Sequence, residues 1–406
     1  MKYLIATYIL FGSFWGISQT SLPAVISTEG SSGLFWSEGE FDQRTQSLSN
    51  AFSRKLFRGG EISESEINKE LDRHRSLNRF GRNYGLNLAF VPKKMKFFSS
   101  EHTNWMFELG HQSFLSGSYA KGLFGLAMLG NANYLGEQVS LAESHLTLVD
   151  WQHLGVGFYH RPTGSYLTLN VVQSSAFASG DLPVGAYESG ADSSWLELSA
   201  TGNVEYSGGN FGQSWGLSLN GRFQYHMPTG RFGQVPILME VKNMGIVYMP
   251  ETVSYRVDTV LRYDGLNLDD ILGFRNANFE SANWFDTLQV ERDTTGSWQL
   301  LPASIEISKP LRFVSTTPWQ VFYGVRAYPF IRYLPRLHVG INAKVWSGFH
   351  AGLVAVYGGF GGFRSGLYVN YASNKLYMGL GTEDIYGLIS GKGFGKMLNF
   401  RLVCAL

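Results

Sequence analysis

Long runs of strict alternation between apolar and polar residues constrain this chain more than any other feature of its sequence. In the clearest run, residues 215–227, the side chains of one face run from Trp215 and Leu217 to Met227, and polar or small residues lie between them. A helix repeats every 3.6 residues and cannot produce this pattern, whereas a strand with one apolar face does. Similar runs occupy residues 84–90, 253–263, 319–327, 337–345 and 363–371.

The length of these runs separates two kinds of β protein. Many are about ten residues long, which is what a tilted strand needs to cross the apolar band of an outer membrane. Strands in soluble β-sandwiches average only about 5 to 6 residues. The sequence therefore predicts an all-β fold, a transmembrane antiparallel β-barrel of about 14 to 16 strands with a short N-terminal helical segment. The weakest candidate strands are those near residues 139–149 and 303–309.

Composition agrees with a barrel and excludes other classes. Charged residues make up 16% of the chain and aromatic residues 15%, and 48 of the 406 residues are glycine. The formal net charge of +1 lacks the basic excess of a nucleic-acid binder, so we expect no nucleic-acid partner. The mean hydropathy of -0.08 is too low for a helical membrane protein. It suits a barrel, because the polar lumen face of a barrel offsets its apolar face.

The N-terminus predicts export. Met1 and Lys2 precede a short apolar run from Tyr3 to Trp15, so residues 1–18 read as a signal peptide rather than as a membrane-spanning helix. We expect residues 19–82 to form a helical or irregular segment that is a plug or lies in the periplasm, and residues 83–406 to form the barrel. Ser63 and Glu66 form a capping box before a charged helix, which a solvated linker explains equally well. The only cysteine, Cys404, excludes disulfides within the chain.

Connector lengths predict the orientation. If the last strand ends in the periplasm, alternate connectors fall on alternate sides, and outer-membrane barrels have short periplasmic turns and long outer loops. This rule assigns short turns to the periplasm, at residues 161–164, 249–252, 347–349 and 372–374. It assigns long loops to the other side, at residues 175–193, 265–302 and 382–396. Residues 118–137 break the rule, because they fall on the periplasmic side and are long, with a short helix expected around Leu126.

No residue pattern indicates covalent chemistry. Residues 212–216 match G-x-S-x-G, but a nucleophile elbow needs a sharp strand-to-helix turn, and here the alternation continues straight on from Trp215. His145, His153 and His160 have spacings that no compact metal motif uses. We therefore expect no catalytic residues, no metal and no cofactor.

Charged residues on the polar faces are the candidate functional residues. Those expected to line the lumen are Arg222, Arg256, Asp258, Arg262, Asp264, Arg326, Arg336, Lys344, Arg364 and Arg401, with Glu240 and Lys242 if their strand faces the same way. They either pair across strands and hydrate the interior, which we favour, or form a selectivity ladder or a contact surface for a plug. Trp284, Phe285 and Trp298 in the long loop 265–302 are candidates for interaction with a partner.

Several short motifs resemble a family of Bacteroidota outer-membrane barrels of unknown function. These barrels are distantly similar to the fatty-acid porin FadL group and to barrels of the type IX secretion and gliding machinery. The motifs are Ser18-Gln19, Leu129-Gly130-Asn131, Asn243-Met244-Gly245, Leu301-Pro302-Ala303 and Leu380-Gly381-Thr382. The resemblance implies an outer-membrane barrel with helical material at its N-terminus, no cofactor, and a role in transport or in a surface complex.

Three functions follow as alternatives, all in the outer membrane of a Gram-negative bacterium and in contact with its lipid. The first is passive, FadL-like transport of a small or hydrophobic solute, which needs a continuous lumen or a lateral opening marked by a glycine or proline kink in one strand. The second is an anchoring component of a secretion, gliding or surface-protein complex, with a protein partner at the long loops. The third and most remote is a lipid hydrolase, for which the sequence shows no convincing Ser and His pair at one rim.

Overall fold

The computed structural model of this chain describes most of it. It covers residues 24–25, 33–98, 100–208, 213–229, 233–263, 290–312, 318–373 and 375–406. The expected signal peptide, residues 1–18, lies outside the described residues, and so do Asp264, Trp284 and Phe285.

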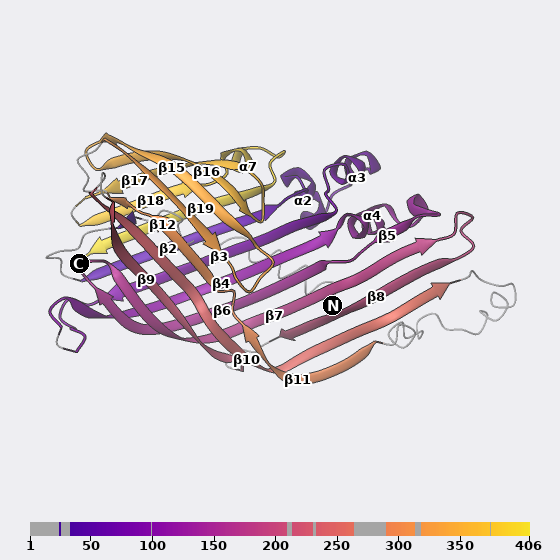
Figure 1. The fold of residues 1–406 in the computed structure, drawn as a ribbon, viewed down its shortest axis with the longest axis horizontal. Helices are drawn as coiled ribbons and strands as arrows, with labels where there is room; N and C mark the ends of the chain where they lie inside the picture. The colour runs from indigo at the N-terminus through magenta and orange to yellow at the C-terminus, as the bar shows by residue number, and fades with distance from the viewer. Residues whose placement is uncertain are drawn as a thin grey trace.

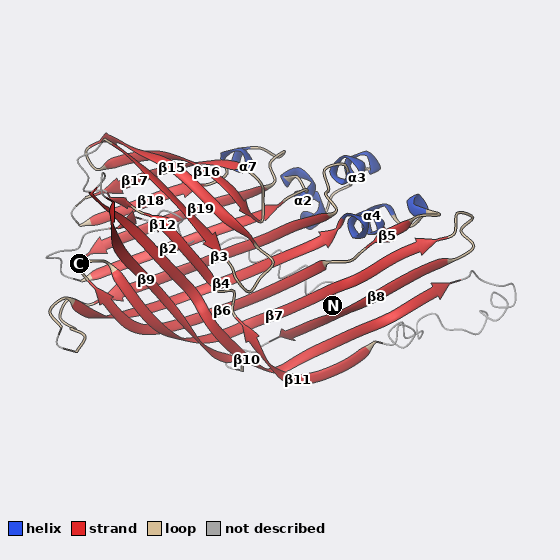
Figure 2. Cartoon of the chain, in the orientation of Figure 1, coloured by secondary structure: helices blue, strands red, loops and turns tan. Residues whose placement is uncertain are grey.

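The described strands close into one antiparallel barrel (Figures 1 and 2). They are β2 Leu34–Thr45, β3 Leu77–Val91, β4 Thr103–Ala120, β5 Gln138–Ser140, β6 Ser144–His160, β7 Ser165–Ser189, β8 Leu196–Gly208, β9 Trp215–Thr229, β10 Gly233–Tyr263, β11 Glu291–Leu300, β12 Ser304–Lys309, β14 Trp319–Ala327, β15 Leu334–Trp346, β16 Phe349–Gly359, β17 Arg364–Ala372, β18 Leu376–Thr382 and β19 Gly395–Ala405. A separate parallel pair joins β1 Ala24–Val25 to β13 Leu311–Arg312. The ring closes through β19 and β2, which pair from Gly395↔Arg44 to Ala405↔Leu34, and through one registered pair between β2 and β3, Thr45↔Phe80.

The ring contains fourteen strands among the described residues, because three of them are each interrupted once. β5 and β6 both pair with β7, β8 and β9 both pair with β7 and β10, and β11 and β12 both pair with β10. Each of these pairs therefore forms one line of the wall with a break in it. The predicted all-β barrel of about 14 to 16 strands is confirmed.

The two ends of the barrel differ. At the end where β2 begins and β19 ends, here called the terminal end, the connections include the short turns 161–164 and 347–348. The opposite end, here called the loop end, carries the long connections 46–76 and 383–394. Residues 118–137 also lie at the loop end, since β5 continues the line of β6, so their expected periplasmic position was wrong.

Two other expected connectors were wrong for a common reason. Residues 249–252 are a bulge within β10, and residues 175–189 belong to β7, which is 25 residues long. Strands this long carry irregularities inside them, and a bulge containing Pro250 has the composition of a turn.

The barrel starts at Leu34 and not at residue 83, which corrects the expected boundary. β2 and the first residues of β3 belong to the wall, because Glu38, Glu40, Asp42 and Arg44 alternate with smaller or apolar residues in a strand paired with β19. The rest of segment 19–82 supplies α2 Asn50–Arg58 and α3 Glu64–Leu71. The capping box of Ser63 and Glu66 is present at the start of α3.

The helices form a cap at the loop end (Figure 2). Besides α2 and α3 they are α4 Lys121–Leu129, the 3-10 helix Ala132–Tyr134 and α7 Ile385–Ile389. Phe52, Ile67 and Phe124 pack together in this cap, and Lys55 binds Glu66 at 2.6 Å and lowers the pKa of that exposed carboxyl. None of the described helices is long and apolar enough to span a bilayer.

The outer face of the barrel is apolar, as the alternation predicts. Leu219 and Ile341 are 40% and 46% exposed, although both are large aliphatic residues in the middle of strands. Trp215, Tyr248 and Trp298 occupy one cross-strand row toward the loop end and are also exposed. Such a row matches the aromatic girdle at a membrane surface.

A sheet extends beyond this aromatic row (Figure 1). It consists of residues 176–189 of β7, the whole of β8, residues 253–263 of β10 and the first residues of β11. We call it the outer extension. It carries exposed charged side chains such as Arg256 and Asp258 alongside exposed Val260.

Candidate functional site

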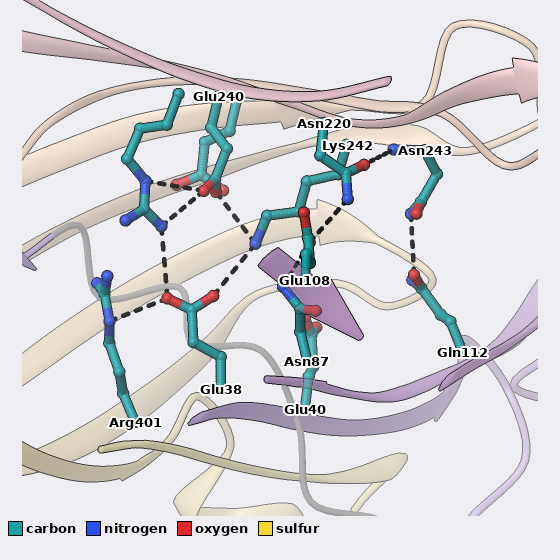
Figure 3. Close-up of polar contacts among 12 residues, drawn as sticks. Glu38, Glu40, Asn87, Glu108, Gln112, Asn220, Glu240, Lys242, Asn243 and Arg401 are labelled. Carbon is teal, nitrogen blue, oxygen red and sulfur yellow. Dashed lines mark hydrogen bonds and ion pairs between the residues drawn. The ribbon is translucent and has the colours of Figure 1, made fainter. Parts of the chain in front are cut away.

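Ion pairs join opposite walls of the barrel across its lumen (Figure 3). Glu38 of β2 contacts Arg401 of the adjacent β19 at 2.9 Å. It also contacts Arg222 of β9 at 3.4 Å and Lys242 of β10 at 3.5 Å. β9 and β10 lie five and six strands away from β2 in the ring, so these contacts cross the interior.

A second carboxylate of β2 repeats this arrangement toward another wall. Glu40 contacts Arg326 of β14 at 3.2 Å, and β14 lies six strands from β2 in the other direction. Arg326 in turn holds Glu306 of β12 at 2.6 Å. On the first side, Glu240 accepts from Arg222 at 2.7 Å. All five side chains are at most 12% exposed, and each charge has an opposite partner, as buried charges require.

Toward the loop end the same strand continues the network. Asp42 and Arg44 form an ion pair, and Arg44 Nη1 donates to Asp384 at 2.9 Å. Nearby, Glu383 lies 3.3 Å from Arg336 and 3.5 Å from Arg364. β2 therefore places four charged side chains into the lumen. Glu38 and Glu40 pair with other strands, Arg44 pairs with the start of the α7 connection, and Asp42 pairs with Arg44 of the same strand.

Amides fill the remaining polar space. Glu108 of β4 accepts hydrogen bonds from Thr168 at 2.6 Å, from Asn87 at 2.7 Å and from Asn220 at 2.9 Å. Asn243 donates to Gln112 of β4 at 2.9 Å, again between strands that are not neighbours. Asn243 has a φ of 57° at a bulge of β10, a backbone conformation that asparagine tolerates better than most residues.

Apolar layers lie on both sides of this polar zone, as the inward residues of β4 show in order. Met106 belongs to a lower apolar layer near the terminal end, Glu108 and Gln112 are polar, and Phe114 belongs to an upper apolar layer. The lower apolar layer contains Leu34, Trp36, Ala89, Val91, Met106, Tyr159, Tyr166, Tyr377 and Val403. The upper apolar layer contains Phe114, Val149, Trp151, Val172, Phe177, Val247, Met249, Leu301, Tyr328 and Phe360.

Residues after β12 also fill the interior at the terminal end. Leu311 is fully buried against Phe322, Val354 and Tyr368, which point inward from β14, β16 and β17. Within the described part of the chain, side chains from opposite walls therefore meet across the lumen at several heights.

The structure brings together half of the residues predicted to line the lumen. Arg222, Arg326, Arg336, Arg364 and Arg401 are buried inside and paired, which is the interpretation the sequence favoured. The other described residues lie elsewhere and are exposed. Arg256, Asp258 and Arg262 belong to the outer extension, and Lys344 lies near the terminal end of β15.

The charged residues of β2 that take part in these contacts were not predicted, whereas their partners Arg222 and Arg326 were, and Lys242 was named as conditional on the facing of its strand. Glu38, Glu40, Asp42 and Arg44 lie in the segment expected to be helical or irregular, although their alternation with Gly39, Phe41 and Gln43 was the signal that could have found them. Trp298 lies on β11 in the aromatic row and not in a loop. Ser214 of the G-x-S-x-G match is fully buried, which does not suit a nucleophile.

Comparisons with known proteins find only distant likenesses. No family model matches the chain, and no curated protein matches it. Among solved structures, the toluene transporter TodX of P. putida shares 9% identity at a TM-score of 0.38, over 94% of this chain and 91% of that one. The translocator domain of autotransporter NalP from Neisseria meningitidis shares 10% identity at a TM-score of 0.28, over 93% and 89%. Likenesses this distant assign neither a family nor an activity, and the expected kinship with Bacteroidota and type IX barrels stays a prediction.

Proposed function

We propose that this protein is a non-enzymatic barrel of the Gram-negative outer membrane that passes a small apolar solute by a gated route. The observation that carries the proposal is the contact of opposite walls through ion pairs across the lumen, with an apolar layer above them. An open water-filled porin keeps a polar channel free, whereas this interior is filled. A solute that crosses must enter the upper apolar layer and leave it by a route that does not pass through the ion pairs.

The wall beside the upper apolar layer offers such a way. Registered pairing of β7 passes from Gln173↔Trp215 on β9 to Ala176↔Gly208 on β8, and Ser174 and Ser175 lie between these pairs. On the other side, pairing of β10 passes from Tyr248↔Trp215 to Val253↔Tyr206 across the bulge at Pro250. Proline cannot donate to a ladder, so a strand kink at this position weakens the wall.

The end of the registered pairing between β9 and β10 and the apolar interior lie at the same height. Val247 and Met249 belong to the upper apolar layer and flank the end of the registered pairing between β10 and β9. On the outside, Trp215 and Tyr248 belong to the aromatic row at the membrane surface. A solute leaving the upper apolar layer between β7 and β10 would emerge at the aromatic row, at the membrane surface, without passing the ion pairs.

A disulfide lock tests this route. In a Cys404→Ser background, Ser174→Cys with Ser214→Cys would join β7 to β9 just beyond the last registered pair, Gln173↔Trp215. The matched control is Ser116→Cys with Thr147→Cys, a registered pair within the regular wall of β4 and β6. Cells that produce the protein should take up the apolar dye N-phenyl-1-naphthylamine faster than vector cells. The lock should abolish the gain, reductant should restore it, and the control lock should have no effect.

Each other outcome has a definite meaning. Wild-type uptake equal to that of vector cells contradicts transport of apolar solutes. Uptake that survives a fully formed lock keeps transport but contradicts the lateral route. If both disulfides abolish the uptake equally, uptake requires movement of the whole barrel wall and not of this position alone.

The outer extension favours a second candidate function, that of an anchor in a surface complex. It rises beyond the aromatic row, and its exposed residues include Arg256, Asp258 and Val260. Deleting residues 265–302 is not a clean test of it, because residues 291–300 form β11. Purification in mild detergent should instead compare the wild type with Arg256→Glu and Arg262→Glu, and a stoichiometric partner lost from both variants would support the anchor.

A further inference from the structure

The connection between β3 and β4 at the terminal end carries a basic and aromatic pocket that the proposed function does not use. The pocket has a volume of about 450 Å³ and is lined by Lys94, Met95, Lys96 and Trp105. Lys93 and Lys96 are exposed on the same connection, and within the described part of the chain none of these three lysines has a carboxylate partner. The pocket therefore presents uncompensated positive charge.

Trp105, which lines the pocket, belongs to a cluster of aromatic rings. Phe97 lies 4.8 Å from Trp105 and 5.1 Å from Phe158, measured between ring centroids. Phe98 contacts Phe97 at 4.5 Å and is 83% exposed. Trp105 and Phe158 are cross-strand partners on β4 and β6. They belong to the outward face of the barrel, the face that also carries exposed Leu109 and Leu154.

The backbone of the connection is held in place. Trp105 donates its N–H to the carbonyl of Met95 at 2.9 Å, and Phe97 donates to the carbonyl of Thr103 at 2.8 Å. The buried Asn104 side chain donates to the carbonyls of Pro92 and Lys93. Arg161 in the next turn donates to Asn104 Oδ1 at 2.6 Å. The pocket is therefore preformed, which lowers the entropic cost of binding.

We propose that this pocket binds the phosphate of an anionic phospholipid headgroup. Lysine ammonium groups bind phosphate as point charges. The aromatic rings match the interfacial depth at which headgroups lie. The apolar outer face that continues past Leu109 and Leu154 is where the acyl chains of the same lipid would lie. The terminal end is the side of the short turns, which in outer-membrane barrels faces the periplasm, so the lipid belongs to the inner leaflet.

Native mass spectrometry of the delipidated full chain tests the proposal. The protein in detergent is titrated separately with phosphatidylglycerol and with phosphatidylcholine, and bound lipids are counted after removal of detergent. The wild type should retain one phosphatidylglycerol in preference to phosphatidylcholine. Each lysine near an anionic surface contributes about a fivefold change in binding, so Lys94→Gln with Lys96→Gln should weaken retention about 25-fold.

Matched controls separate a site from general surface charge. Lys344→Gln with Lys375→Gln removes the same charge at the same end of the barrel and should leave retention unchanged. Trp105→Ala should weaken retention while both lysines remain. All variants must first show the heat-dependent gel mobility of a folded barrel.

Four results would overturn the proposal. The first is an equal loss of lipid retention in the Lys94→Gln with Lys96→Gln variant and in the Lys344→Gln with Lys375→Gln control, and the second is retention that Lys94→Gln with Lys96→Gln leaves unaffected. The third is equal retention of the two lipids. The fourth is displacement of phosphatidylglycerol by an equal concentration of inorganic phosphate. The last would identify a site for a free anion instead of a lipid.

Discussion

Replacing Glu38 by glutamine tests whether the ion pairs across the lumen hold the barrel closed. Glu38 contacts Arg401, Arg222 and Lys242 together, and its side chain is 2% exposed. Glutamine keeps the size and the ability to hydrogen-bond and removes only the charge. Arg222 and Lys242 then retain Glu240 as their partner, so the ion pairs that are lost are the two across the lumen and the one with Arg401 of the adjacent strand.

The magnitude follows from the distances. At 3.4 and 3.5 Å, each cross-lumen contact is worth roughly 5 kcal/mol before desolvation, with an effective dielectric of about 20. Desolvation offsets much of this attraction, but removal of one partner from a buried pair typically costs about 3 to 5 kcal/mol. Part of that cost is the separation of β2 from β9 and β10, so the closed state should lose a few kcal/mol relative to an open one.

Single-channel recording in a planar bilayer measures this difference. A change of about 3 kcal/mol alters the ratio of open to closed lumens more than a hundredfold. The wild type should be electrically silent for most of the time, and Glu38→Gln should show frequent openings. Glu197→Gln is the matched control, because Glu197 contacts Arg262 at 3.8 Å in the outer extension, away from the lumen.

Two results would refute the reasoning. If Glu38→Gln folds and stays as silent as the wild type, the apolar layers alone close the lumen. If the wild type itself shows a large steady conductance, the wall-to-wall pairs do not block the passage of ions.

Two further predictions concern the membrane face and the cap. Leu219→Asp and Ile341→Asp should each lower the amount of folded barrel in the outer membrane, since a charge on the lipid face costs about 2 to 4 kcal/mol or less. Val204→Asp on the outer extension should not lower it. Equal levels of all three variants would contradict the assignment of Leu219 and Ile341 to the lipid face. Burial between Tyr119 and Phe124 lowers the pKa of His74 from its ordinary value of 6.5. The unfolded cap therefore binds a proton at His74 more readily than the folded cap does. The stability of the cap is consequently full above pH 6.5 and falls as the pH drops below this value. Hydrogen-exchange protection factors of α3 should fall between pH 7.5 and 5.5 in the wild type and in His102→Gln, and much less in His74→Phe; an unchanged slope in His74→Phe assigns the effect to another group.

The sequence predicted those parts of the fold that depend on local alternation. A run such as 215–227 determines both that a strand forms and which face meets lipid, because neighbouring side chains of a strand point to opposite sides. Leu219 and Ile341 face outward, and Arg222 and Arg401 face inward, as expected. The sequence does not show how far a charged residue on a strand lies from the opposite wall, because the neighbours of that strand are unknown. Arg256 and Arg222 therefore looked alike in the sequence, although Arg256 is exposed and Arg222 is buried.

The lumen network could not be predicted because it depends on the curvature of the whole barrel. Glu38 and Arg222 are 184 residues apart, and they meet only because β2 and β9 lie opposite each other in a closed ring of fourteen strands. Interrupted strands added to the difficulty. The breaks between β8 and β9 and between β11 and β12 contain residues typical of loops, and for this reason residues 265–302 looked like a single long loop that included Trp298.

The balance of charges inside the barrel decides what kind of solute could open it. A selectivity ladder presents one sign of charge to a passing ion, but here the carboxylates Glu38, Glu40, Glu240 and Glu306 face the cations Arg222, Lys242, Arg326 and Arg401. An ion that entered this set would have to replace a partner of opposite charge and would leave the displaced charge buried and alone, which is costly. An apolar solute in the upper apolar layer displaces only side chains such as Met249 and Phe177 and exchanges one apolar contact for another. The same interior that stops ions is therefore compatible with an apolar solute, provided that the solute leaves before it reaches Glu38.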